Sequence, residues 1–360
     1  MGLQEKTYFG YSDKQVQDEI KNRNKFNKKS KNKNDLSYLV ECEKGWDILN
    51  KEQKDFCYKV LSGDNIFLTG AAGTGKSFVL NFIFKFLSKQ NISFGKTAMS
   101  GITALNIKGS TLHSFLGVGL ADRDDVSILK MVYKNKKARA RIEGCKILFI
   151  DEVSMLSGKL FDTINFILKR VRNTREDFGG IQVVICGDML QLPPIFKDLD
   201  NNCLLFESKS YKQGLFRKCE LLEIVRQKED KEYAELLNEI RKGNLSNIWK
   251  IKERIGAKLD LPEGIRPVRL LGYNKSVDSY NKQCLESIEE QPKNFKSIDY
   301  GEQHHIDSFE RNCPVSKLLT LKKGAQVTLC WNVDVEDGFV NGLLGSVTGF
   351  ASDGSPIVKF

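Results

Sequence analysis

Residues 70–77 read GAAGTGKS, and this stretch decides how the rest of the chain is interpreted. It fits the pattern G-x-x-x-x-G-K-[ST]. It follows NIFLTG (65–70), which predicts a buried strand, and leads into SFVLNFIFKFLSKQ (77–90), which predicts a helix packed between layers. A glycine-rich turn between a strand and a helix closes backbone N–H groups around phosphate oxygens, and the helix dipole adds to the attraction. We therefore expect a phosphate-binding loop here.

The residue types in this loop predict separate tasks. Lys76 would reach the β- and γ-phosphates of a nucleotide, and the hydroxyl of Ser77 would ligate Mg²⁺. A chance match is the alternative, and the strand–loop–helix context argues against it. The remaining residues would surround the phosphates with their backbone: Gly70, Ala71, Ala72, Gly73, Thr74 and Gly75.

A pair of acids follows a second buried strand. CKILFID (145–151) is a continuous apolar run that ends in Asp151, and Glu152 comes next. Asp151 would hold Mg²⁺. Glu152 would act as a general base on the attacking water. The alternative is a pair of acids at the start of a helix, which has no catalytic meaning.

A glutamine follows a third buried strand, IQVVICGD (181–188). In GDMLQLPPI (187–195), Gln191 stands just ahead of Pro193 and Pro194, which would restrict how the loop leaves the strand. An amide beside the phosphates could hydrogen-bond the γ-phosphate or the attacking water. Without the phosphate-binding loop, Gln191 would be an ordinary polar loop residue.

Apolar runs and helix-like segments alternate along the chain, which predicts an α/β fold with a parallel sheet. The apolar spacing predicts a helix over 230–244, and RPVRLLGYN (266–274) is typical of another strand. GAQVTLCWNVDVEDGFVNGLLGSVTGF (324–350) is β-rich with glycines, which predicts a small barrel. The expected architecture is a doubly wound α/β body with a small β insertion.

Composition narrows the class of protein. Of the 360 residues 41% are hydrophobic, and no apolar run is long enough to cross a membrane. No apolar segment typical of a signal peptide follows the N-terminal residues. The nine cysteines are scattered singly beside only three histidines, so we expect no disulfide, no zinc site and a reducing compartment.

The net charge of +10 is concentrated near the N-terminus. Residues 21–34, KNRNKFNKKSKNKN, hold seven basic residues and no acidic one, which leaves +3 for the rest of the chain. Such a segment is typical of a solvated tail, of a tether to phosphates or of a nuclear-import signal. A second basic run, KMVYKNKKARAR (130–141), predicts a solvated or DNA-facing helix.

Seven stretches, taken in order, resemble the petite-integration-frequency (PIF-type) DNA helicases, superfamily-one enzymes that move 5′ to 3′ on single strands. They are LNKEQKDFCYKVLSGDNIFLTGAAGTGKS (49–77), GITALNIKGSTLHSF (101–115), ILFIDEVSML (147–156), DFGGIQVVICGDMLQLPPI (177–195), LLEIVRQ (221–227), LLNEIRKGN (236–244), and LKKGAQVTLCWN with VNGLLGSVTGF (321–332 and 340–350).

The resemblance implies a role for each matching residue. Gln53 matches the glutamine that reads adenine, and Gln191 matches the γ-phosphate sensor. Arg226 in EIVRQ matches an arginine finger from the second motor domain, although taken alone it is a helix-flanking charge. Thr111 and His113 in STLHSF match a motif at the DNA-binding surface; their alternatives are a capping threonine and a satisfied histidine.

The resemblance also implies a P-loop NTPase with two RecA-like domains facing each other across an ATP cleft. We expect a basic tail over 1–43, the first RecA-like domain over 44–205, the start of the second over 206–318, and an SH3-like β insertion over 319–360. Family members continue into an H-K-S-Q-G-like and then an A-L-S-R-like motif, and neither occurs here. We therefore expect the second domain to be incomplete.

The implied activity is ATP-dependent unwinding of DNA, with ATP and Mg²⁺ as ligands and single-stranded and tailed or structured duplex DNA as partners. The implied roles are repair, recombination, replication or telomere maintenance. We expect an intracellular protein, nuclear if its source is eukaryotic, with the mitochondrion and a viral replication site as alternatives. Two other functions stay open: an ATP-responsive DNA-binding module without motor activity, and a different P-loop ATPase such as a clamp-loader-like protein or a kinase. The sequence leaves the oligomeric state open.

Overall fold

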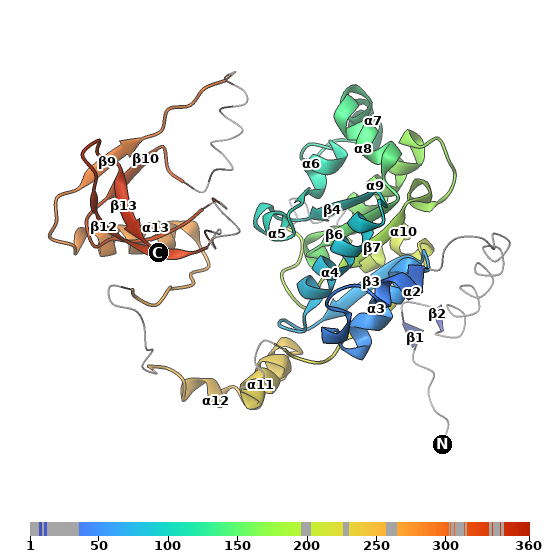
Figure 1. Ribbon diagram of the computed structural model, residues 1–360, viewed down its shortest axis with the longest axis horizontal. Helices are drawn as coiled ribbons and strands as arrows, with labels where there is room; N and C mark the ends of the chain where they lie inside the picture. Colours follow the sequence, from blue (N-terminus) through green and yellow to red (C-terminus); the bar gives the residue numbers. More distant parts are fainter. Residues whose placement is uncertain are drawn as a thin grey trace. The chain divides into compact units, whose positions relative to one another are not determined.

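The chain forms two compact units, Met1–Lys250 and Ile251–Phe360 (Figure 1). The computed structural model describes residues 7–8, 11–12, 36–195, 203–225, 230–256, 265–301, 303, 306, 313, 315–330, 333, 339 and 342–360. The basic segment 21–34 and Arg226 lie outside these described residues.

A six-stranded sheet forms the centre of the first unit. Its strand order is β5-β4-β6-β7-β3-β8, and every pairing is parallel. The predicted α/β class with buried parallel strands is therefore confirmed. The strands are β3 (Ile66–Gly70), β4 (Phe94–Ala98), β5 (Ser110–Thr111), β6 (Ile147–Asp151), β7 (Gln182–Cys186) and β8 (Arg217–Leu221); a separate pair is formed by β1 (Thr7–Tyr8) and β2 (Tyr11–Ser12).

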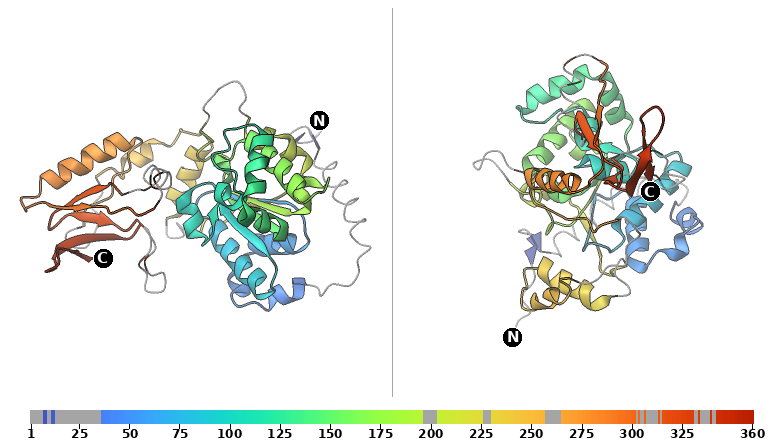
Figure 2. Two further views of the ribbon diagram at one scale, coloured as in Figure 1. Left: turned by 90° about the horizontal axis from the view of Figure 1, so that it is seen from above. Right: turned by 90° about the vertical axis from the view of Figure 1, so that its left-hand side faces the viewer.

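Along the central strands β3, β6 and β7, successive side chains enter two different cores, one on each face of the sheet. Phe149 and Val184 pack with helices α2 to α5, whereas Leu148 and Val183 pack with α6 to α9. Figures 1 and 2 show these helices on both sides of the sheet. The helices are α2 (Leu36–Glu41), α3 (Lys51–Leu61), α4 (Lys76–Lys89), α5 (Gly101–Asn106), α6 (Leu112–Leu116), α7 (Asp125–Lys134), α8 (Lys136–Gly144), α9 (Gly158–Val171), α10 (Lys209–Gln213), α11 (Lys231–Arg241) and α12 (Trp249–Lys252). Short 3-10 turns are η1 (Trp46–Ile48), η2 (Val153–Met155), η3 (Asp177–Gly180) and η5 (Leu205–Glu207).

The FGGIQ stretch, which carries much of the family resemblance, has a packing role. Phe178 is fully buried, and its ring lies 5.1 Å from that of Phe161 and 6.0 Å from that of Phe216. Its backbone N–H donates to the Asn165 side chain over 2.7 Å. Gly179 has φ +66°, and a Cβ there would come within 2.5 Å of the Leu168 carbonyl oxygen. The turn therefore needs glycine where it passes the end of α9.

The structure divides the chain differently from the boundaries expected. β8 lies after the expected boundary at residue 205, yet all five of its residues pair with β3 of the first sheet. The first unit continues to Lys250. At the other end, α2 lies inside the expected tail of residues 1–43, and Val40 is fully buried in the core. The first domain therefore gains an edge strand and an N-terminal helix because apolar side chains there complete its core.

The second unit is small and mostly antiparallel where it is described. β11 (Gln326–Thr328), β12 (Leu344–Phe350) and β13 (Pro356–Lys359) form one sheet, and β9 (Lys293–Lys296) pairs with β10 (Leu318–Leu321). A core around Leu321 and Val347 also packs against Leu285, near the end of α13 (Asn274–Glu286). The expected strand over 266–274 is wrong: residues 265–271 have no regular secondary structure, and α13 begins at Asn274. Leu270 is 94% exposed, so this apolar run has no core to enter within the described part of the unit.

Candidate nucleotide-binding site

Three strand ends meet at one edge of the first sheet. β7 lies between β6 and β3, and the three strands run parallel. Their carboxyl ends therefore carry the glycine-rich loop after β3, the acid pair at the end of β6 and the GDMLQLPPI segment after β7 to the same place. In open parallel sheets this edge is where ligands bind.

The loop after β3 has the backbone of a phosphate cradle. Gly73 and Gly75 have φ of +81° and +86°, a region that favours glycine. A Cβ on Gly70 would come within 2.6 Å of the Leu221 carbonyl oxygen, so this position is closed to larger residues. The Thr74 hydroxyl donates to the Ala71 carbonyl over 2.9 Å. The Thr74 side chain thus braces the loop from within.

Lys76 and Ser77 stand at the start of α4, where the helix dipole favours an anion. The Lys76 ammonium donates to the carbonyl oxygens of Gly70 and Ala71, over 2.8 and 3.0 Å. These are loop contacts that a phosphate could replace. Ser77 is exposed, and so is Ala72 at the tip of the loop.

Gln53 lies beside the phosphate-binding loop although it comes from α3. It is 3% exposed and forms a capping box with Asn50: its N–H donates to Asn50 over 2.9 Å, and its amide oxygen accepts the Asn50 N–H over 3.1 Å. A Cβ on Gly75 would come within 2.6 Å of the Gln53 amide nitrogen. The capping box therefore orients this amide against the loop.

The acid pair sits in a turn of unusual backbone. Glu152 has φ +53° and ψ 45°, a conformation that non-glycine residues seldom adopt and that clusters at functional sites. Asp151 is 6% exposed and accepts the Glu152 N–H over 2.9 Å. In the same turn the buried Ser154 hydroxyl has no hydrogen-bond partner among the described residues. Buried polar groups are rarely left unpaired unless a water or a ligand binds them.

Burial raises the pKa of both carboxyl groups, and for Glu152 nearby negative charges add to the effect. For Asp151 burial is the main cause, opposed by hydrogen bonds from the Glu152 N–H and the Cys186 thiol and by the charge of Lys76. For Glu152 burial again comes first, followed by the negative charge of Asp151. Asp188 adds to this repulsion. A carboxylate with a raised pKa holds a proton more readily, as a general base must.

Gln191 stands in the turn after β7, and its contacts run to Asp188. Its backbone N–H donates to the Asp188 carbonyl over 2.9 Å, and its side-chain amide donates to the Asp188 carboxylate over 3.2 Å. Asp188 in turn accepts two hydrogen bonds from Arg241 of α11. Sequence patterns alone do not single out Asp188 or Arg241, although an acid that follows a buried strand is also the pattern that predicts Asp151.

Three expected site residues do not belong to these three strand ends. Thr111 ends β5 at the same carboxyl edge of the sheet, two strands away from Asp151, and His113 follows it. Arg226 falls outside the described residues, but the residue before it, Val225, donates its N–H to the Gly73 carbonyl over 2.8 Å. Thr111 caps α6 by accepting the Ser114 N–H over 3.3 Å, which favours its structural alternative. His113 is partly buried, and burial lowers the pKa of its imidazole.

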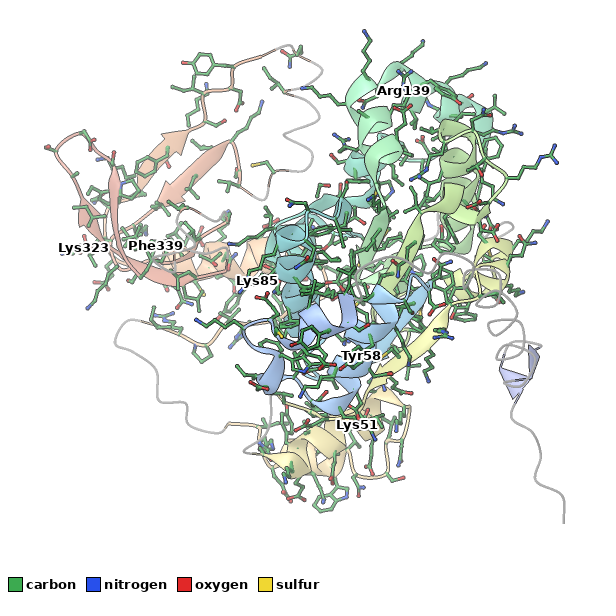
Figure 3. The ribbon with its side chains drawn as sticks, turned by 45° about the vertical axis from the view of Figure 1, so that its right-hand side comes forward. Lys51, Tyr58, Lys85, Arg139, Lys323 and Phe339 are labelled. Atoms are coloured by element: carbon green, nitrogen blue, oxygen red, sulfur yellow. The ribbon has the colours of Figure 1, made fainter. Side chains whose placement is uncertain are left out.

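The second basic run forms α7 and α8, and part of it is structural. Arg141 donates to the carbonyl oxygens of Phe115 and Ser114, at the end of α6, over 3.0 and 2.8 Å. Figure 3 shows Arg139 of α8 on the opposite side of the unit from Lys51 of α3. The run therefore lies away from the helix that carries Gln53.

The described residues contain no disulfide, no cluster typical of a metal site and no helix that could span a membrane. All nine cysteines are free thiols. Among the described residues no group of three His, Cys, Asp or Glu side chains is arranged to hold a metal ion. No described helix has both the length and the apolar character needed to span a bilayer.

A parallel sheet with a phosphate cradle, an acid pair and a glutamine at one edge defines a P-loop NTPase with a RecA-like domain. The family model described as PIF1-like helicase matches residues 48–250, and the model of the 2B domain of DNA helicase Pif1 matches residues 305–350. The chain therefore belongs to the PIF1-like helicase family.

The chain is similar to several curated and solved members of this family. It is 39% identical over 316 residues to the ATP-dependent DNA helicase PIF1 of Candida albicans, covering 84% of this chain and 35% of that protein. A crystal structure of Pif1 helicase from Candida albicans has a TM-score of 0.76 at 38% identity, covering 85% of this chain and 70% of that one. A crystal structure of Pif1 helicase from Bacteroides in complex with ADP-AlF3 and ssDNA has a TM-score of 0.61 at 26% identity, covering 86% of this chain and 74% of that one. The chain spans 35% to 49% of the length of the first curated relatives that it matches.

Proposed function

We propose that this chain is the ATP-binding part of an ATP-dependent DNA helicase. The observation that carries the proposal is the meeting of the phosphate cradle, Asp151, Glu152 and Gln191 at one edge of the parallel sheet. The family membership supports the same activity, since the curated relatives are named ATP-dependent DNA helicases.

The residues at the sheet edge divide the work of phosphoryl transfer. The cradle and Lys76 would hold the phosphates and offset their charge, and Gln53 would select adenine. Glu152 would accept a proton from the attacking water, helped by its raised pKa. Gln191 would respond to the γ-phosphate or the water, and Arg226 would add positive charge from beyond the described segment.

The donor set at this edge fits Mg²⁺. The Ser77 hydroxyl and the Asp151 carboxylate would supply the oxygen ligands that this ion prefers. When bound, Mg²⁺ would neutralise charge on the phosphates. Asp151 is held for that task by the Glu152 N–H and the buried Cys186 thiol.

The second ligand would be DNA. A Bacteroides relative was solved with ADP-AlF3 and ssDNA together, and another structure concerns forked dsDNA. We infer that this chain binds single-stranded and tailed duplex DNA, moves 5′ to 3′, and serves repair, recombination, replication or telomere maintenance inside the cell, in the nucleus if the source is eukaryotic. Thr111 and His113 are the candidate contacts.

The decisive experiment follows ATP hydrolysis and strand displacement together. The chain would be mixed with Mg²⁺, ATP and duplexes carrying either a 5′ or a 3′ single-stranded tail, beside the Lys76→Ala variant. A helicase of the proposed kind displaces only the 5′-tailed strand, and Lys76→Ala abolishes this. ATP-sensitive DNA binding without displacement would instead identify an ATP-responsive DNA-binding module, and binding of neither ligand would refute the proposal.

A further inference from the structure

Arg241 reaches the nucleotide edge from a helix that does not pack on either face of the sheet. Figure 1 shows α11 beyond the helices that cover the two faces. Its guanidinium nevertheless donates twice to Asp188, from Nε to Oδ2 and from Nη2 to Oδ1, at 2.5 Å each. The two residues are 53 positions apart. This two-point pairing is the strong and geometrically specific form of an arginine–carboxylate contact.

The pair is largely withdrawn from water. The Asp188 side chain is 1% exposed and the Arg241 side chain 21%. Burial opposes ionisation of Asp188, but the Arg241 hydrogen bonds and the Leu190 N–H outweigh it, so the pKa of Asp188 lies below its ordinary value. Asp188 is therefore a stable anion at neutral pH, and Arg241 donates to both of its oxygens.

The same carboxylate holds Gln191. Asp188 Oδ2 accepts both Arg241 Nε and the Gln191 side-chain amide, the latter over 3.2 Å. An ionised carboxylate only accepts hydrogen bonds, so the amide atom that faces it must be the nitrogen Nε2. The amide oxygen Oε1 is thereby left to meet a ligand. An oxygen acceptor suits the O–H of a water and does not suit the oxygens of a phosphate.

Resting on the function proposed above, we propose that Arg241 is a positioning residue for ATP hydrolysis: through Asp188 it holds the Gln191 amide with its oxygen ready to accept a hydrogen bond from the attacking water. Gln191 touches the reacting water, whereas Arg241 acts only through Asp188. Loss of Arg241 would leave the Leu190 N–H as the backbone contact of the Asp188 carboxylate, too little to hold both of its oxygens and the Gln191 amide in place.

The test measures recognition of the transition state without turnover. Binding of ADP is compared with and without aluminium fluoride, in the presence of Mg²⁺, for the wild type and for Arg241→Ala, Arg241→Lys, Gln191→Ala and the double variant Arg241→Ala/Gln191→Ala. The matched control is Arg217→Ala. Arg217 pairs with Asp64 over 3.0 Å with side-chain exposures of 25% and 17%, and it lies at the start of β8, at the end of the strand opposite to the nucleotide edge.

Aluminium fluoride should tighten ADP binding to the wild type, and Arg241→Ala should reduce that gain about tenfold, because one hydrogen bond to the reacting centre is lost. The affinity for ADP alone should stay within about twofold of the wild type, which also shows that the fold is intact. In a protein that already carries Gln191→Ala, the further change Arg241→Ala should reduce the gain from aluminium fluoride by no more than about twofold, because the two residues act as one unit. Arg217→Ala should keep the full gain.

Arg241→Lys keeps the buried charge but loses the two-point contact, so it should recover only part of the gain. Arg241→Lys also tests the positioning role in the case that Arg241→Ala does not fold. The positioning role would be overturned if aluminium fluoride tightened ADP binding to Arg241→Ala or Arg241→Lys as much as it does for the wild type. It would also be overturned if the losses of the two single variants simply added up in the double variant. Lys76→Ala is measured in the same assay as a check on the nucleotide site. If the wild type shows no gain, or Lys76→Ala binds ADP with aluminium fluoride as tightly as the wild type does, the nucleotide site itself fails and the inference fails with it.

Discussion

Val225 donates its backbone N–H to the carbonyl oxygen of Gly73 in the P-loop over 2.8 Å. Three residues earlier, the Leu222 N–H donates to the Glu52 carboxylate over 3.2 Å. Asn50 of the Gln53 capping box donates to Glu223 over 2.9 Å. The segment 222–225 is therefore attached to both the phosphate cradle and the helix that carries Gln53. The chain leaves the first sheet against the nucleotide site, directly ahead of Arg226.

Lys76→Ala should abolish hydrolysis without unfolding the protein. Both Lys76 hydrogen bonds go to loop carbonyls, so its loss removes charge opposite the phosphates and leaves the core intact. We expect the rate to fall by about 10²- to 10³-fold, as for loss of one donor to a transition-state oxyanion. ATP hydrolysis and thermal melting would be measured together.

Lys85→Ala is the matched control, because Lys85 is an exposed lysine of the same helix and is labelled in Figure 3. It should leave both hydrolysis and melting unchanged. Near-normal turnover in Lys76→Ala would contradict the assignment of the site.

The acid limb of the pH profile should report Glu152. Its pKa lies above the ordinary 4.5, chiefly because it is buried and then because Asp151 is near. A general base works when ionised, so activity is present above its pKa and is lost as the pH falls through it. The limb of kcat/KM for ATP should therefore lie above pH 4.5. A limb at or below 4.5 would show that another group controls the rate.

Gly179→Ala should destabilise the first unit more than Gly243→Ala does. Both glycines have positive φ, +66° and +84°, so an alanine at either site costs about 1–2 kcal/mol of backbone strain. Only at Gly179 does the new Cβ also meet backbone, 2.5 Å from the Leu168 carbonyl oxygen, whereas nothing lies within 4 Å at Gly243. Urea unfolding would give the two free energies, and equal losses would refute the packing role of the FGGIQ turn.

Deleting residues 1–35 should weaken binding to single-stranded DNA and flatten its dependence on salt. Residues 21–34 carry seven basic side chains, and each phosphate contact adds to the slope of log K against log salt. The deletion must stop before Leu36, because α2 begins there and Val40 is in the core. Deletion of residues 1–20 keeps the basic run and serves as the control. Identical slopes in both deletions would show that the run does not touch DNA.

Local patterns predicted the parts of the site that depend on neighbours in sequence. The glycine spacing of residues 70–77 predicted the cradle, because a turn between a strand and a helix is a local structure. The apolar runs ending in Asp151 and in GDMLQLPPI predicted strands whose ends meet, since parallel strands place their carboxyl ends at one edge. The alternation of such runs also predicted the α/β class, which the sheet confirms.

Only the tertiary structure decided which distant residues complete the site. The Arg241–Asp188 pair, the edge strand β8 and the attachment of Val225 to Gly73 join segments separated by many residues, and no local spacing records such contacts. The prediction of a strand over 266–274 was wrong for the same reason. An apolar run indicates that its side chains favour burial, but a strand forms only where a neighbouring strand pairs with its backbone N–H and C=O groups. Residue types and their spacing were enough to predict which chemistry the nucleotide site would carry. The folded chain decided how its amides and carboxylates are aimed, because direction depends on packing between elements that are far apart in sequence.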